Sequence, residues 1–263
     1  MTRTTQNGVS YYQFKNLAAC RGIEHRIFTR SGGYSQPPFA SLNVCYGIGD
    51  TRKNVSANRG VISDSMATGR LVFVRQVHGC EVAVLGRNRK KRDKTTAAAG
   101  QTVTADAVVT DLEGKNLVIQ VADCQAVLLY EPARRVIANV HCGWRGSVQN
   151  IIGHTIEVMK QHFGCHPSRI QAGIGPSLGP CCAEFINYRK EIPMEFWRYM
   201  GLNAHFDFWA LSRDQMIQAG MAEINIEPSG ICTRCHTDDF FSYRAARTTG
   251  RFAAVIGLTE RKS

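Results

Sequence analysis

The chain has 263 residues, of which 44% are hydrophobic, and a formal net charge of +11 at pH 7. This length and apolar content are those of a folded globular protein with a sizeable core. No run approaches the roughly 18 unbroken apolar residues of a membrane span, and residues 1–14 lack the apolar core of a secretion signal. We therefore expect a soluble, cytoplasmic protein without a membrane partner.

Ten cysteines are spread over this mid-sized chain. Without an export signal, they are predicted to be reduced thiols, some in the core and at least one bound to metal. The positive charge favours anionic partners, which include nucleic acid, membrane surfaces and small phosphates, and does not choose among them.

The N-terminal third is predicted to contain strands and one helix. A loop rich in Gly, Pro and Ser over residues 31–41 is long enough to be functional. Asp50 is the expected N-cap of a helix that runs to about Ala67. Strands are predicted at residues 11–14, 25–29, 71–74 and 81–85, the last two as a hairpin-like pair.

The centre of the chain is predicted to be rich in strands. A basic run, residues 87–94, comes first and is typical of a solvated loop. Short apolar runs bounded by turn residues then follow one another, as expected of strands buried within a sheet. They cover residues 106–110, 117–121, 126–130 and 135–140.

The C-terminal part adds helices to these strands. Ser147 is the expected N-cap of an amphipathic helix that ends at Gly164. Further strands are predicted at residues 169–174, 240–243 and 252–256, and helices at 188–200 and 211–219. Since no repeat or linker is visible, we predict an α+β fold, a single domain of mixed β-sheets flanked by helices over residues 1–263.

Three segments place a metal-capable side chain where a strand meets a loop, which is where functional sites collect. These side chains are His78, Cys124 and His141. One thiolate and two imidazoles suit zinc, and three protein ligands leave a fourth position open, as in catalytic sites. The alternative is that Cys124 is a buried core thiol and that the histidines satisfy local hydrogen bonds.

Several ordered motifs extend this pattern to nearly the whole chain. They read RQVHG, TADAVVTD, ADC, HCGWRG, GIGPSLGPCCAEF and FFSYRAARTTGRFAAVIGL. Together they resemble the laccase-domain family, the bacterial purine nucleoside phosphorylases also labelled polyphenol oxidases. The resemblance runs from residue 29 to the C-terminus.

The resemblance implies that His78, Cys124 and His141 bind Zn²⁺. It also implies phosphorolysis of adenosine, inosine, guanosine and 5′-methylthioadenosine, deamination of adenosine, and an α+β fold of mixed sheets flanked by helices. The expected partners are purine nucleosides and phosphate. Cys142 departs from the commoner HAGWRG form and places a second thiol beside the three proposed ligands.

Further residues are candidates for substrate binding and catalysis. Arginine suits phosphate because of its bidentate fork, which makes Arg145 the first candidate and Arg75 and Arg59 the next. Asp123, beside Cys124, could orient the metal ligand or carry a proton, or it could be a structural turn residue. Asn43 could reach nucleoside hydroxyls, although a loop-capping role fits equally well.

Other functions remain open at this point. Copper also binds Cys and His, so a copper-dependent polyphenol oxidase is the main alternative, although the chain has eight histidines and no His-x-His pair. Cys124 could instead be the nucleophile of a cysteine hydrolase with His141 as its base. The basic run at residues 87–94 could contact nucleic acid, but no aromatic platform accompanies it, so no nucleic-acid partner is expected.

Two more patterns bear on the reaction. Cys232, Cys235 and His236 match the C-x-x-C-H pattern of haem attachment; a second structural metal, a redox pair or plain thiols are preferred without an export signal. The H-x-E and P-C-x-x-C motifs of zinc nucleobase deaminases are both missing from the sequence. Phosphorolysis is therefore the expected main reaction, and the roles of Cys181 and Cys182 stay open.

Overall fold

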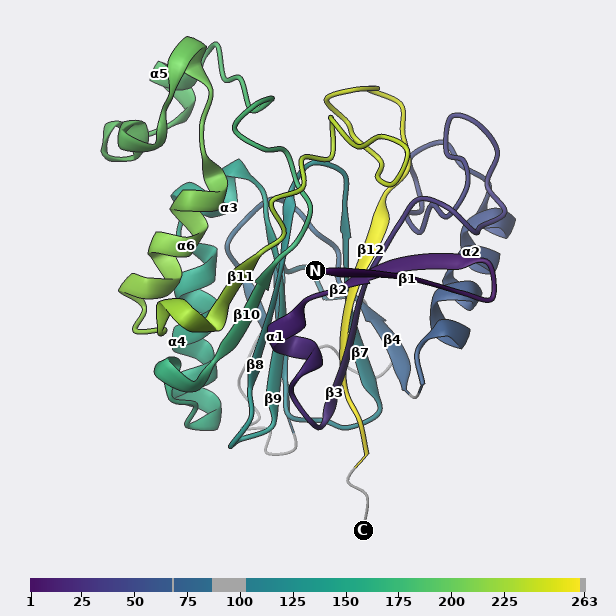
Figure 1. The fold of residues 1–263 in the computed structure, drawn as a ribbon, viewed down its shortest axis with the longest axis horizontal. Coiled ribbons are helices and arrows are strands. Elements are labelled where there is room, and N and C mark those ends of the chain that lie inside the picture. The colour runs from purple at the N-terminus through teal and green to yellow at the C-terminus, as the bar shows by residue number, and fades with distance from the viewer. Residues whose placement is uncertain (68, 87–102, 261–263) are drawn as a thin grey trace.

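Two six-stranded mixed sheets pack against each other and carry helices on their outer faces (Figure 1). The computed structural model describes residues 1–67, 69–86 and 103–260. Strands from both sheets contribute apolar side chains to one shared core, for example Ile119 from one sheet and Leu128 from the other. This arrangement confirms the predicted α+β class with mixed sheets flanked by helices.

The first sheet has the strand order β1-β2-β3-β12-β7-β4. Only β4 and β7 pair in parallel, and the other neighbours are antiparallel. Its strands are β1 (Thr2–Gln6), β2 (Val9–Gln13), β3 (Ile23–Phe28), β4 (Arg70–Phe73), β7 (Lys115–Val121) and β12 (Phe252–Leu258). The last strand thus lies in the middle of the sheet, between strands from the first half of the chain.

The second sheet has the order β11-β10-β8-β9-β6-β5. Its parallel pairs are β5 with β6 and β10 with β11. Its strands are β5 (Val82–Leu85), β6 (Ala107–Thr110), β8 (Gln125–Glu131), β9 (Val136–Cys142), β10 (Gln171–Ile174) and β11 (Ile226–Pro228). Every residue of β8 and β9 is buried, because the other sheet covers one face and helices cover the other.

Helices complete a four-layer structure. The helix α4 packs its Ile152, Ile156 and Met159 onto the outer face of the second sheet, and Ile62 of α2 packs onto the first. The α-helices are α1 (Lys15–Ala18), α2 (Arg52–Ser65), α3 (Trp144–Val148), α4 (Ile151–Phe163), α5 (Tyr188–Glu191) and α6 (Phe208–Gln218). The 3₁₀ turns are η1 (Pro167–Arg169), η2 (Met194–Tyr199), η3 (Leu202–Ala204) and η4 (Glu223–Asn225).

Some predicted strands differ from the observed ones. Residues 71–74 and 81–85 do not form a hairpin, because β4 and β5 belong to different sheets. The segment 240–243 is not a strand; Phe240 and Phe241 are buried core residues on an irregular stretch of backbone. The strand predicted over residues 240–243 from its apolar aromatic residues is therefore wrong.

The predicted helix ends also need correction. The helix expected over residues 188–200 is interrupted at Pro193, which lacks the N–H that a helix interior requires. The N-cap of α2 is Thr51, whose hydroxyl accepts from the amide of Asn54, and that of α4 is Asn150. Ser147 instead lies within α3. The predicted C-cap at Gly164 is correct, since this residue has φ +67°.

Two predictions concern contacts with membranes and with nucleic acid. No helix in the described ranges has the length and apolar character needed to cross a membrane. The basic run at residues 87–94, considered above for nucleic acid, lies outside the described residues.

Candidate metal centre

His78, Cys124 and His141 converge at the edge where the chain passes from one sheet to the other. His78 lies in the connection from β4 to β5, Cys124 in the turn from β7 to β8, and His141 near the end of β9. One ligand atom from each lies within 4.8 Å of the other two. The two imidazole rings meet edge to face, with centroids 4.8 Å apart.

The loop that carries His78 is held by hydrogen bonds to both sheets. The side-chain amide of Gln76 donates to the carbonyl of Gln120 and accepts from its amide, each at 2.9 Å. The backbone amides of residues 77, 78 and 79 all donate to the carboxylate of Asp106. These bonds stabilise the left-handed backbone of His78, whose φ is +60°.

Asp106, which lies within the motif TADAVVTD, also positions His141, a role that the motif itself does not reveal. Nδ1 of His141 lies 2.8 Å from Oδ1 of Asp106, and both side chains are buried. Since Nδ1 is engaged with the carboxylate, Nε2 is the nitrogen left to bind a metal. Burial raises the pKa of Asp106, but hydrogen bonds from His141 and the loop amides lower it below its usual value overall.

The three donor groups favour a thiolate at Cys124. Burial raises the pKa of Cys124, but the attraction of His141 and hydrogen bonds from both histidines lower it to about 6. Burial lowers the pKa of His141, whereas the Cys124 thiolate and Asp106 raise it to about 9. The thiolate is the form of cysteine that binds metals, and a metal ion bound here would take the place of the proton on His141.

The chemistry and shape of this site fit zinc. One thiolate and two imidazoles form a set of borderline ligands that zinc accepts, with one tetrahedral position left over. Gly143 adjoins the donors: a Cβ built on it would lie 3.1 Å from Sγ of Cys124 and 3.2 Å from Cδ2 of His78. A side chain at this position would crowd the donor atoms, so glycine keeps the centre open.

The neighbouring thiol of Cys142 is turned elsewhere. Its sulfur lies 3.2 Å from Oγ of Ser147 in the protein interior. Burial raises the pKa of Cys142 to about 12, so this group stays a thiol. Cys124 is the cysteine that groups with the two histidines.

The arginines proposed for phosphate lie in different surroundings. Arg145 is the second residue of α3, two residues after Gly143. Its guanidinium is exposed over the Trp144 ring, and within the described part of the chain it forms no salt bridge. Arg75 is also exposed, three residues before His78. Arg59 is half-buried, packs on the Phe73 ring and donates to the carbonyl of Val44. Arg145 and Arg75 are therefore both exposed, whereas the guanidinium of Arg59 is engaged in contacts within the protein.

Asn43 and Asp123 make several hydrogen bonds to the protein itself. Asn43 is buried and bonds through its side chain to Asp50, Cys45 and the amide of Arg251. The carboxylate of Asp123 accepts from the hydroxyl of Thr233 and from the amide of Arg244, each at 2.6 Å. It thereby joins the turn that carries Cys124 to two loops from the C-terminal part of the chain.

A cavity of about 620 Å³ lies elsewhere on the surface. It is lined by residues of η2 and α6 and by Cys181, and none of the three metal-site residues lines it. Donor chemistry and hydrogen bonding, rather than cavity size, therefore identify the candidate site.

The chain is similar to known proteins over most of its length. Residues 24–259 match the family described as multi-copper polyphenol oxidoreductase laccase. The purine nucleoside phosphorylase YlmD of Geobacillus stearothermophilus is 34% identical over 249 residues, which cover 89% of each chain. A purine nucleoside phosphorylase of Deinococcus radiodurans is also 34% identical, over 98% of this chain and 96% of its own.

Solved structures extend this likeness to the fold. The crystal structure of YlmD from Geobacillus stearothermophilus has a TM-score of 0.83 and 30% identity, and covers 98% of both chains. That of the hypothetical protein YfiH from Bacillus licheniformis has a TM-score of 0.82, with 26% identity over 97% of both chains. The family resemblance seen in the sequence motifs is thus confirmed, and the chain belongs to the multi-copper polyphenol oxidoreductase laccase family.

Proposed function

We propose that the protein is a zinc-dependent purine nucleoside phosphorylase that accepts adenosine, inosine, guanosine and 5′-methylthioadenosine and also deaminates adenosine. The observation that carries this proposal is the convergence of His78, Cys124 and His141 within 4.8 Å. The names of the relatives supply the reaction class, since both relatives described above are purine nucleoside phosphorylases. Zinc is chosen because its preferred ligands include thiolate and imidazole.

Different side chains would bind different parts of the substrates during phosphorolysis. A phosphate oxygen bonds to C1′ of the ribose while the bond from C1′ to the purine nitrogen breaks, so the site must hold an anion against a sugar that becomes cationic. Arg145 is suited to hold that phosphate, because its exposed guanidinium forms no salt bridge within the described residues. Arg75 and Arg59 are secondary candidates, and Asn43 is a candidate for the ribose hydroxyls.

The metal ligands are held by residues with positioning roles. His78, Cys124 and His141 would hold a zinc ion that would supply Lewis-acid catalysis. Asp106 fixes the ring of His141 and the loop of His78 through hydrogen bonds. Asp123 holds the turn of Cys124 through Thr233 and Arg244, and its assignment as a proton carrier in deamination stays a prediction.

Copper-dependent oxidation of phenols is the second candidate function. The family description, multi-copper polyphenol oxidoreductase laccase, is the observation in its favour. A multicopper cluster requires many histidines, whereas the group described above contains two, His78 and His141. We therefore rank this activity below phosphorolysis.

Chromatography of the products formed from adenosine, with and without phosphate, tests the proposal. Phosphorolysis gives adenine only when phosphate is present. Deamination gives inosine without phosphate, and with phosphate the inosine is partly converted to hypoxanthine. Metal-stripped protein should regain these activities with Zn²⁺. Recovery only with Cu²⁺, together with oxidation of a phenol and no nucleoside turnover, would establish the copper alternative instead.

We further infer that residues 1–263 act as one functional unit. The C-terminal strand β12 lies between β3 and β7, so removal of the last strand would open the middle of the first sheet. A cytoplasmic location is proposed with it, because the substrates, nucleosides and phosphate, are small intracellular metabolites. Fractionation of cells that express the full chain tests this location.

A further inference from the structure

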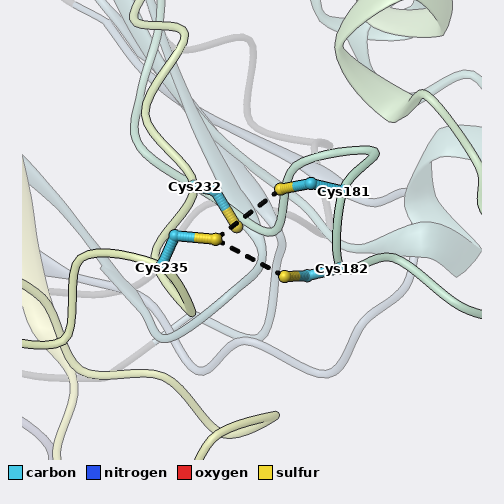
Figure 2. Close-up of side chains that lie close together, drawn as sticks. All are labelled: Cys181, Cys182, Cys232 and Cys235. Atoms are coloured by element: carbon cyan, nitrogen blue, oxygen red, sulfur yellow. Dashed lines mark hydrogen bonds between the residues drawn. The ribbon is translucent and has the colours of Figure 1, made fainter.

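Four cysteines gather at a second place in the molecule, away from the residues proposed for phosphorolysis. Cys181 and Cys182 lie in the loop after β10, and Cys232 and Cys235 lie in the loop after β11. Their sulfur atoms all lie within 4.8 Å of one another. Figure 2 shows the four side chains pointing toward a common centre from the two loops.

The fold brings these two loops together. The strands β10 and β11 are parallel neighbours, so their C-terminal ends leave the same edge of the sheet. A short parallel bridge between Ser177 and Cys232 continues this pairing into the loops. Cysteines fifty or more residues apart in the sequence are therefore set opposite each other.

The spacing of the sulfur atoms matches a tetrahedral metal site. Zinc–thiolate bonds of about 2.3 Å in a tetrahedron place neighbouring sulfur atoms about 3.8 Å apart. The sulfur of Cys235 lies 3.7 Å from that of Cys181 and 3.6 Å from that of Cys182. A disulfide requires about 2.0 Å and would use only two of the four sulfurs.

The backbone and the solvent exposure around the sulfurs also suit a bound ion. The backbone amide of Gly179 donates to the sulfur of Cys232 at 3.3 Å. Cys182 and Cys232 are buried, whereas Cys181 and Cys235 are exposed, so an ion can reach the group from solvent.

We propose that Cys181, Cys182, Cys232 and Cys235 bind one zinc ion as four thiolates, in a second metal centre distinct from that of His78, Cys124 and His141. Four sulfur ligands fill the tetrahedron, so this centre is structural and holds no substrate. Binding releases the remaining thiol protons to solvent and involves no oxidation.

This second centre stabilises the first through hydrogen bonds to the turn that carries Cys124. The hydroxyl of Thr233, between Cys232 and Cys235, donates to the carboxylate of Asp123, and the amide of Leu178 donates to its carbonyl. Asp123 directly precedes the ligand Cys124. The zinc ion therefore fixes the two loops that position this turn.

X-ray absorption at the zinc edge tests the proposal in the full-length His78→Ala variant, in which the first centre is impaired. We expect about one zinc per chain, surrounded only by sulfur at about 2.3 Å. A zinc shell that contains nitrogen, a bound iron in place of zinc, or a chain without zinc would each overturn the proposal. This readout does not depend on nucleoside turnover, so it can fail while the proposed function holds.

A second set of variants locates the ion. In the His78→Ala background, Cys235→Ser should lose the remaining zinc and lower the melting temperature, while Cys20→Ser, a half-buried cysteine outside both groups, should keep it. If Cys235→Ser fails to fold, the intact mass of the protein with all four cysteines, measured under non-reducing conditions, provides a separate test. A disulfide among these four cysteines in protein purified with reductant would contradict the zinc assignment.

Discussion

The carboxylate of Asp106 bonds to the ring of His141 at 2.8 Å and also accepts the backbone amide of His78 at 2.9 Å. One buried side chain thus fixes two of the three proposed metal ligands. Neither ligand can shift without breaking a hydrogen bond to this carboxylate, so the geometry of the centre depends on Asp106 as much as on the ligands themselves.

Replacing Asp106 by Asn should weaken zinc binding. The amide group of Asn is uncharged and turns a donor toward backbone amides that need an acceptor. We expect zinc affinity to fall by about 10–100-fold, as for other residues that orient metal ligands. Competition with a chelator measures the affinity, and Asp64→Asn, on the exposed face of α2, is the control. Equal zinc affinity in the two variants would contradict the role of Asp106.

Gly143→Ala tests the shape of the metal centre. The added Cβ would lie 3.1 Å from the sulfur of Cys124 and 3.2 Å from the His78 ring, so the ligands must move apart. We expect lower zinc content and lower turnover. Gly60→Ala is the control, because a Cβ there meets nothing within 4 Å, and it should add about 0.5–1 kcal/mol of stability to α2. A Gly143→Ala protein with full zinc content would refute the crowding argument.

The pKa values of Cys124 and His141 predict how the folding stability of the metal-free protein depends on pH. Cys124 has a lowered pKa of about 6, so its contribution to stability is lost as pH falls through that value. His141 has a raised pKa of about 9, so its contribution is lost as pH rises through that value. The thiolate and the imidazolium together should therefore stabilise the metal-free fold most between about pH 6 and pH 9.

Alkylation of Cys124 in metal-stripped protein measures the lower limit of this range. The rate of alkylation should rise with pH, with a midpoint near pH 6. Mass spectrometry of the peptide that contains Cys124 measures this rate. The midpoint should move upward in His141→Ala, which lacks the imidazolium. A midpoint near 9, the ordinary value for cysteine, would show that the histidines do not stabilise the thiolate.

Arg145→Ala tests the proposed phosphate contact. Loss of a charge-assisted hydrogen bond costs about 1.5–3 kcal/mol, so the KM for phosphate should rise about tenfold or more while zinc content stays unchanged. Arg145→Lys should give an intermediate value because it keeps the charge but loses the bidentate fork. Arg189→Ala, on the exposed surface of α5, should match the wild type. An unchanged KM in Arg145→Ala would transfer this role to Arg75 or Arg59.

The sequence predicts the buried strands well because their apolar runs are short and end at turn residues. It does not predict β1, whose residues are polar and mostly exposed. That strand is specified instead by the Asn7-Gly8 turn, in which both residues have positive φ, as a two-residue hairpin requires. The helix predicted over residues 188–200 is broken at Pro193, which is visible in the sequence and lacks the N–H that a helix interior requires.

The sequence reveals the proposed metal ligands more directly than it reveals the residue that positions them. His78, Cys124 and His141 stand at strand ends within family motifs, which is a local signal. The role of Asp106 depends on the pairing of β6 with β9, which brings Asp106 beside His141, and a single sequence does not reveal that pairing. The grouping of Cys181 with Cys235 depends likewise on the parallel pairing of β10 and β11.

Zinc content and nucleoside turnover in Cys124→Ser, compared with Cys142→Ser, test the central claim most directly. The two thiols are close in space, but only that of Cys124 groups with the histidines. We predict that Cys124→Ser loses one zinc per chain and its phosphorolytic activity, whereas Cys142→Ser keeps both. A Cys124→Ser protein with wild-type zinc content and turnover would contradict the assignment of this centre.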